Sequence, residues 1–431
     1  MGKLLPLLVA MIALTSFAQA TQLSRRDREL AETMLSNISS DVHKYYFDAK
    51  LHGLDWDALV RETKQNIDKA PDEATAVGEI EALLERLNDS HTSFIPPGNV
   101  YTANYGWEFK IIGNRGFVTE VSPGSDAESK GMRPGDELLT INGFAVDRAG
   151  VPMLKKALYG FFQSKSVDLE LRNPTGKLLH LTVASEVKRG PEFETSWNLN
   201  QQRIANQKAW DREKAKYKEF GPELMILRVP AFLQTDLDVD ALFRRARNHR
   251  TLIVDLRGTP GGRIDSVHDY LGDIFDHDVK IGDSVKRDKV APMIVKGSRR
   301  GAFSGDLIVL VDSETASAGE IFARVVQVQE RGTILGDHSS GRTMESRLFI
   351  HITGGNPVYT YGDSVTVADT VMTDGKSLEH IGVAPDRMSL PSADDLAAGR
   401  DPVLAYAAGL AGVTLSAEDA ARLFQPATPT E

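Results

Sequence analysis

A serine lies where an apolar strand is expected to end and an amphipathic helix to begin. Residues 307–311 have the composition of a buried strand. Ser317 follows shortly afterwards, directly before a segment in which Ile321, Phe322 and Val325 recur at helical spacing. The first N–H groups of a helix lack partners within it and carry the positive end of its dipole. The position therefore suits a nucleophile whose attack creates an oxyanion, although serine is also a common helix N-cap.

A glycine-rich turn follows a second apolar strand. Residues 252–262 read Leu-Ile-Val-Asp-Leu-Arg-Gly-Thr-Pro-Gly-Gly, a buried type of strand that leads into a turn whose backbone can approach a ligand closely. Strand ends of one α/β sheet face a common crevice. We therefore expect this turn and Ser317 to lie together, whereas Asp255 and Arg257 are interpreted as a structural ion pair.

Composition limits the class of protein. Residues 1–20 have the charged start, apolar stretch and Ala-Gln-Ala end of a secretory signal peptide, and we expect no membrane span after its cleavage; a retained anchor is the alternative. The absence of cysteine excludes disulfides and thiol chemistry. The net charge of −10, spread without a basic block, argues against nucleic acid as a partner. A length of 431 residues is too great for one core.

The pattern of elements predicts an α+β multidomain protein. After the signal peptide we expect an N-terminal helical domain over 21–100, a β domain over 101–188 and an α/β domain over 189–431 that begins with a charged, helical connector at 201–219. In the last domain, strands at 224–229, 252–255, 307–311 and 333–335 alternate with helices at 236–248, 264–275 and 318–329. A terminal helix is expected at 401–411.

These residues together resemble the carboxy-terminal processing, or tail-specific, protease family and its relative, the tricorn protease. The resemblance is carried by residues 88–92, 252–262, 312–327 and 379–386. These segments follow one another along the chain in the same order as in the family. Residues 131–136 and 141–143 resemble a PDZ domain. The resemblance implies a serine protease core of the ClpP and crotonase type. It also implies an oxyanion hole formed by the N–H groups of Ala318 and of Gly262 or Gly261.

The PDZ resemblance implies a peptide-binding site. Such domains bind a peptide C-terminus by strand addition, with the carboxylate held by backbone N–H groups. The matching loop here is Tyr105, Gly106 and Trp107. A PDZ fold kept only as a spacer between domains is the alternative.

The chain departs from the family at the general base. The lysine and glutamine that activate the serine in lysine-using relatives fall on Arg342 and Ser346. Arginine keeps its proton, so it cannot deprotonate Ser317. Arg342 could bind a substrate carboxylate or form a structural salt bridge.

The tricorn branch implies a different arrangement, in which His91 is the base, supported by Ser90 and Glu379. An imidazole can act as base and then as acid near neutral pH, and an adjacent hydroxyl can orient its other nitrogen. A structural histidine, a capping Ser90 and a packing role for Glu379 are the alternatives. His338 and His380 are weaker candidates for the base.

The sequence therefore predicts a periplasmic or secreted serine endopeptidase that cleaves unstructured polypeptides or protein C-terminal regions through an acyl-enzyme on Ser317. No metal or cofactor is implied. An inactive homologue that binds peptides through its PDZ-like domain is the rival prediction, and an esterase using the same serine is a third. The substrate, the cleavage preference and assembly into a homo-oligomer are left open.

Overall fold

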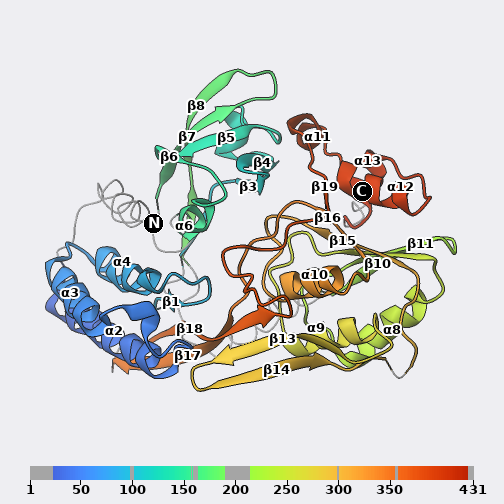
Figure 1. Ribbon diagram of the computed structural model, residues 1–431. Coiled ribbons are helices and arrows are strands. Elements are labelled where there is room, and N and C mark those ends of the chain that lie inside the picture. The colour runs from blue at the N-terminus through green and yellow to red at the C-terminus, as the bar shows by residue number, and fades with distance from the viewer. Residues whose placement is uncertain are drawn as a thin grey trace.

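The computed structural model describes residues 23–97, 101–156, 158, 164–189, 214–298, 300–354 and 358–425. The expected signal peptide and residues 201–213 of the expected helical connector lie outside these residues. The last part of that connector prediction is wrong, because Lys216–Phe220 forms strand β10. Within the described ranges, no helix combines the length and apolar character needed to cross a membrane. The chain is a mixed α+β multidomain protein (Figure 1).

The N-terminal part is helical, as predicted. It contains α2 (Arg25–Tyr45), η1 (Leu51–Gly53), α3 (Trp56–Lys69), α4 (Glu73–Leu84) and η2 (Glu85–Leu87). The three α-helices begin at Ser24, Asp55 and Asp72, whose side chains each accept a hydrogen bond from an N–H of the first turn.

Two strands from the far end of the chain cover this helical layer. These are β17 (Glu345–Gly354) and β18 (Val358–Met372), which form an antiparallel pair. Tyr361 and Val365 of β18 share a hydrophobic core with Ile38 and Val42 of α2. β1 (Ser93–Ile95) pairs with β18 directly, so the segment after His91 is fixed to that strand.

The middle of the chain forms a separate antiparallel sheet of order β3-β4-β5-β7-β8, with β6 paired to β5. The strands are β3 (Trp107–Ile112), β4 (Arg115–Val121), β5 (Glu137–Ile141), β6 (Phe144–Ala145), β7 (Ser166–Arg172) and β8 (Leu178–Ala184), with helices α5 (Asp126–Ser129) and α6 (Val151–Lys156). Strands β2 (Tyr101–Asn104) and β9 (Glu186–Arg189) pair where the chain enters and leaves this region.

A third region contains a six-stranded sheet of order β10-β11-β12-β15-β16-β19, parallel from β11 to β19. Its strands after β10 are β11 (Leu224–Arg228), β12 (Thr251–Asp255), β15 (Asp306–Val311), β16 (Thr333–Gly336) and β19 (Arg387–Met388). The helices are α8 (Asp236–Ala246), α9 (Ile264–Gly272), α10 (Ala318–Val328), α11 (Ala393–Ala397), α12 (Pro402–Leu410) and α13 (Ala417–Arg422). The predicted strands and helices of this region are confirmed, with ends shifted by a few residues.

The sequence assigned no elements to two long antiparallel pairs. One is β17 with β18; the other is β13 (Val279–Lys286) with β14 (Lys289–Val295). β13 also pairs with β18, so the two hairpins form one sheet with β1. In Figure 1 this sheet runs along the lower side and connects the N-terminal helices with the α/β region.

Charged contacts join the middle sheet to the loop that precedes α10. Lys110 of β3 lies 2.8 Å from Glu314 and 3.4 Å from Asp312, and Lys155 of α6 lies 2.8 Å from Glu314. Ser313 Oγ donates to the carbonyl of Ile111 at 2.5 Å. The middle sheet is therefore fixed to the segment immediately before Ser317.

Candidate active site

Ser317 occupies a strained turn between β15 and α10. Its backbone has φ +52° and ψ −118°, a region that residues other than glycine rarely adopt. The Ser317 N–H donates to the Arg342 carbonyl at 2.7 Å and contacts Glu320 Oε2 at 3.1 Å. These bonds hold the backbone in a conformation that is unfavourable for serine. Such strain is retained where the surrounding contacts outweigh its energetic cost.

The Gly261-Gly262 turn lies directly against Ser317. A Cβ on Gly261, whose φ is +115°, would be 2.6 Å from Ser317 Cβ and 3.1 Å from its Oγ. A Cβ on Gly262, whose φ is +148°, would be 2.3 Å from the Phe232 carbonyl oxygen. Only glycine fits at both positions. The neighbouring parallel strands β12 and β15 thus bring the two turns together.

Backbone donors are available beside the serine. Among the described residues, no acceptor is found for the N–H groups of Ala318, Gly261 or Gly262. Ala318 is the first residue of α10, where such N–H groups have no partner within the helix. This is the kind of donor set that stabilises a developing oxyanion.

Ser90, His91 and Glu379 form a continuous hydrogen-bonded chain. His91 Nδ1 lies 2.7 Å from Ser90 Oγ, which donates to Glu379 Oε2 at 3.1 Å. Glu379 Oε1 accepts the Ser90 N–H at 2.7 Å, and Oε2 accepts the Thr343 N–H at 2.9 Å. Because the Ser90 hydroxyl hydrogen faces Glu379, Ser90 Oγ accepts from Nδ1–H, which leaves His91 Nε2 as the basic nitrogen.

Asp89 fixes the backbone around this histidine. One of its carboxylate oxygens accepts the N–H groups of His91 at 2.9 Å and Thr92 at 2.7 Å, together with the Thr366 hydroxyl at 2.6 Å. Asn88, with φ +54°, ends η2 just before it. The loop is therefore held by strand β18 rather than by its own helix.

Arg342 contacts both the serine turn and the histidine loop. Its carbonyl accepts the Ser317 N–H, and its guanidinium Nη2 donates to the Ser90 carbonyl at 3.3 Å. In the described part of the chain, no hydrogen bond joins Ser317 Oγ to His91 Nε2. Arg342 therefore connects the histidine loop to the serine turn, while the serine and histidine side chains are not bonded in this state.

Glu320 is an important residue that the sequence analysis missed. It is fully buried, and its two oxygens accept from Ser339 Oγ at 2.6 Å, from the N–H groups of Gly341 at 2.7 Å and Arg342 at 2.8 Å, and from Ser317 N–H. Burial raises the pKa of Glu320, and these bonds oppose that effect. The spacing Ser317-Ala-Gly-Glu320 is a capping-box pattern and could have identified it.

The environment of His91 favours its neutral form. Burial lowers the pKa of His91 to about 4, and the positive charge of Arg342 contributes in the same direction. If His91 is the base, the neutral imidazole is the active form. A lowered pKa keeps that form populated in mildly acidic solution, where an ordinary histidine is protonated.

We therefore expect the acid limb of kcat/KM to fall near pH 4, not near the ordinary histidine value. Replacing Arg342 by Gln removes a positive charge and should shift this limb to higher pH. The measurement is kcat/KM on a fluorogenic peptide across the acid range for both proteins. A limb that is identical in both would contradict the influence of Arg342 on the titrating group.

The three residues of the loop expected to bind a peptide, Tyr105, Gly106 and Trp107, are buried. Tyr105 and Trp107 are 2% and 3% exposed, and Gly106 has φ +74°. Gly106 is packed so closely that an added Cβ would be 2.4 Å from Ser125 Cβ. β3 lies at the edge of its sheet. The Gly106 N–H donates to Asn104 Oδ1 at 2.9 Å and its carbonyl accepts the Ser122 N–H at 2.8 Å, so both of its backbone groups are already paired.

Asp255 and Arg257 form the predicted ion pair. Arg257 donates to Asp255 at 2.8 and 3.0 Å and to Asp401 at 2.8 and 2.9 Å. Although burial alone would raise the pKa of Asp255, the charges of Arg257 and Arg228 hold it well below its usual range. The cluster connects the end of β12 to the start of α12.

Comparison with known proteins adds independent findings. Residues 223–388 match the model of peptidase family S41. The chain is 23% identical over 360 residues to carboxyl-terminal-processing peptidase 3, chloroplastic, of Arabidopsis thaliana, covering 80% of this chain and 66% of the relative. It is 25% identical over 318 residues to the tail-specific protease of Haemophilus influenzae, covering 69% and 43%. It is 25% identical over 396 residues to putative tricorn protease homolog 2 of Streptomyces coelicolor, covering 86% and 31%.

The chain thus spans two thirds or less of the length of these three relatives.

Two solved structures share its fold. Mature CPAF aligns with a TM-score of 0.64 at 15% identity, covering 86% of this chain and 94% of that one. The photosystem II D1 C-terminal processing protease aligns with a TM-score of 0.50 at 20% identity, covering 83% and 93%.

Proposed function

Because residues 223–388 match the model of peptidase family S41, we propose that the chain is a serine endopeptidase that cleaves unstructured polypeptides or protein C-terminal regions. The observation that carries the proposal is the hydrogen-bonded chain from Glu379 through Ser90 to His91. A binding protein that had lost catalysis has no need for these three hydrogen-bonded side chains beside a strained serine and unpaired backbone donors.

In the proposed mechanism, Ser317 Oγ attacks the scissile carbonyl carbon while its proton passes to His91 Nε2. Ser90 accepts from Nδ1–H and stabilises the imidazolium, with the Glu379 carboxylate behind it. The N–H groups of Ala318 and the Gly261-Gly262 turn stabilise the oxyanion. His91 then protonates the leaving amine, and a water molecule hydrolyses the acyl-enzyme with His91 again acting as base.

A closing movement completes this arrangement. Since Ser317 and His91 are not hydrogen bonded in the described state, the two loops must approach each other when substrate binds. We assign the PDZ-like domain, over 101–188, to substrate capture or gating. Its contacts with Asp312 and Glu314 lie directly before Ser317, so a change in its position can reach the serine turn.

We further propose that the protein is exported, to the periplasm or beyond the cell, with residues 1–20 as the signal peptide. The composition of that segment supports this assignment. The proposed division of the remaining chain is 21–100, 101–188 and 189–431.

The experiment that tests the function is digestion of casein by the mature chain and by an Arg342→Lys variant. The guanidinium donates to Ser90 and not to Ser317, so this lysine should not become a base. We expect wild type to cleave casein, the variant to stay within about 10-fold of it, and the lysine not to rescue a His91→Ala variant. Cleavage by Arg342→Lys alone would instead indicate an inactive homologue of a Ser/Lys protease.

A further inference from the structure

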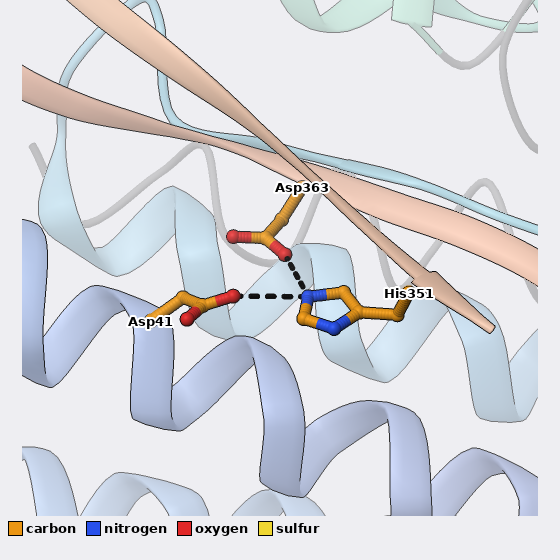
Figure 2. A group of neighbouring side chains, drawn as sticks. All are labelled: Asp41, His351 and Asp363. Carbon is orange, nitrogen blue, oxygen red and sulfur yellow. Dashed lines mark hydrogen bonds and ion pairs between the residues drawn. The ribbon is translucent and has the colours of Figure 1, made fainter. Parts of the chain in front are cut away.

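Two aspartates and a histidine from distant parts of the chain converge between the helical layer and the β17–β18 hairpin. Figure 2 shows Asp41 of α2, His351 of β17 and Asp363 of β18 with their polar ends directed at one another. His351 Nε2 lies 2.9 Å from Asp41 Oδ2 and 3.0 Å from Asp363 Oδ1. The three ligand atoms are all within 4.8 Å of one another.

The two carboxylates of this cluster share a single hydrogen-bond donor. One imidazole nitrogen carries at most one hydrogen, yet it faces two carboxylates. Asp363 is 0% exposed, and its Oδ2 accepts no hydrogen bond within the described residues. Asp41 Oδ2 has the ion pair with His351 but no further partner among those residues. Buried carboxylates are normally paired, so this arrangement suits a bound cation.

The histidine ring is held in position for a shared ligand. Tyr361 stacks on His351 with ring centroids 5.2 Å apart and planes at 27°. The Tyr361 hydroxyl is in turn held by Asn37 Nδ2 at 2.6 Å. Asn37 and Asp41 lie one turn apart on α2, so the same helix face fixes the ring and supplies one carboxylate.

We propose that Asp41, His351 and Asp363 bind a divalent transition-metal ion, with Zn²⁺ the best match, which fixes α2 to the β17–β18 hairpin. One imidazole nitrogen and two carboxylate oxygens suit Zn²⁺, and a water completes four-coordination. Zn²⁺ bonds of about 2.0–2.2 Å place tetrahedral donors about 3.3 Å apart. The two distances from His351 Nε2 to the carboxylate oxygens, 2.9 and 3.0 Å, lie within a few tenths of an ångström of that spacing. The side chains of Asp41 and His351 are 16% and 20% exposed, which provides an entry path.

The proposed metal lies on the strand that positions the histidine loop. Asp363 is opposite Phe94 in the β1–β18 register. Further along β18, Thr366 donates to Asp89, which fixes the His91 backbone. Metal binding at the cluster would therefore stabilise the support of the active site without touching the serine.

The test uses the full mature chain, made without a polyhistidine tag and freed of metal by chelation. Titration with Co²⁺ should give the visible absorption of a tetrahedral site, saturating at about one ion per chain, and Zn²⁺ should displace it. Zn²⁺ should also raise the melting temperature by several degrees. These readouts are independent of proteolysis, so they separate this proposal from the proposed function.

Asp363→Asn and His351→Gln should each abolish the Co²⁺ absorption and the Zn²⁺-dependent shift. Asp41→Asn, at a partly exposed position, provides a third variant if a buried replacement fails to fold. His180→Gln is the matched control, because His180 is exposed beside Glu170 and should leave binding unchanged. Absence of stoichiometric binding by the wild type, or binding that survives both Asp41→Asn and His351→Gln, would overturn the proposal.

Discussion

Ser317→Ala and His91→Ala should each lower kcat on casein by about 10⁴–10⁶-fold, and the double variant should be no slower than either single one. The reason is that nucleophile and base act as one unit, so removing either removes the whole proton-coupled attack. The measurement is initial rates of casein cleavage, with far-ultraviolet circular dichroism to confirm folding. KM should change much less than kcat.

The matched controls are the two other histidines near the site, His338 and His380. The side chain of His338 makes no hydrogen bond within the described residues, and His380 Nε2 contacts the Asn88 carbonyl at 2.8 Å. His338→Ala should stay near wild type and His380→Ala within about 10-fold. If His91→Ala retained activity while either control lost it, the assignment of the base would be wrong.

Glu320→Gln should have the second-largest effect, on both stability and activity. The two Glu320 oxygens accept from Ser339, Gly341, Arg342 and Ser317. A glutamine has one acceptor oxygen, and its NH₂ group would face buried donors instead. We expect a loss of about 2–4 kcal/mol in the free energy of unfolding and at least about 10²-fold in kcat, because the serine turn loses its anchor.

The measurements are urea unfolding and casein cleavage at a temperature well below the melting transition of the variant. Glu223→Gln serves as control, since Glu223 forms an exposed pair with Arg250 and should change stability by less than about 1 kcal/mol. A Glu320→Gln protein that is stable and fully active would show that the backbone bonds around Ser317 hold the turn without this carboxylate.

Local patterns were sufficient for most of the parallel sheet and its helices. The apolar runs before Ser317 and Gly261 are buried on both faces, so they read clearly as strands β15 and β12. The start of α10 followed from the change in periodicity. The connector prediction failed at Lys216–Phe220, where a charged edge strand pairs with β11 and only Tyr217 and Phe220 pack against the cores, which leaves a weak apolar signal.

The β17–β18 hairpin could not be predicted from its own residues. Outward-facing Leu348, Ile350 and Ile352 are more than half exposed, so the alternation of β17 does not follow the usual rule of apolar inside and polar outside. Its inner face carries Phe349, which packs against the helical layer, together with His351. The strand is defined by its partners, the helical layer and β18, which lie far away in sequence.

The sequence by itself determined the types of residue that could act: a serine at a strand-to-helix turn, a flexible glycine pair on the neighbouring strand, and the loss of the lysine at Arg342. Short-range backbone rules control those features. Only the tertiary structure decided that Glu379, Ser90 and His91 form one hydrogen-bonded chain, that Glu320 anchors the serine turn, and that Asp41, His351 and Asp363 meet. Each of these contacts joins segments whose approach depends on how separate layers pack, and no local pattern encodes that packing.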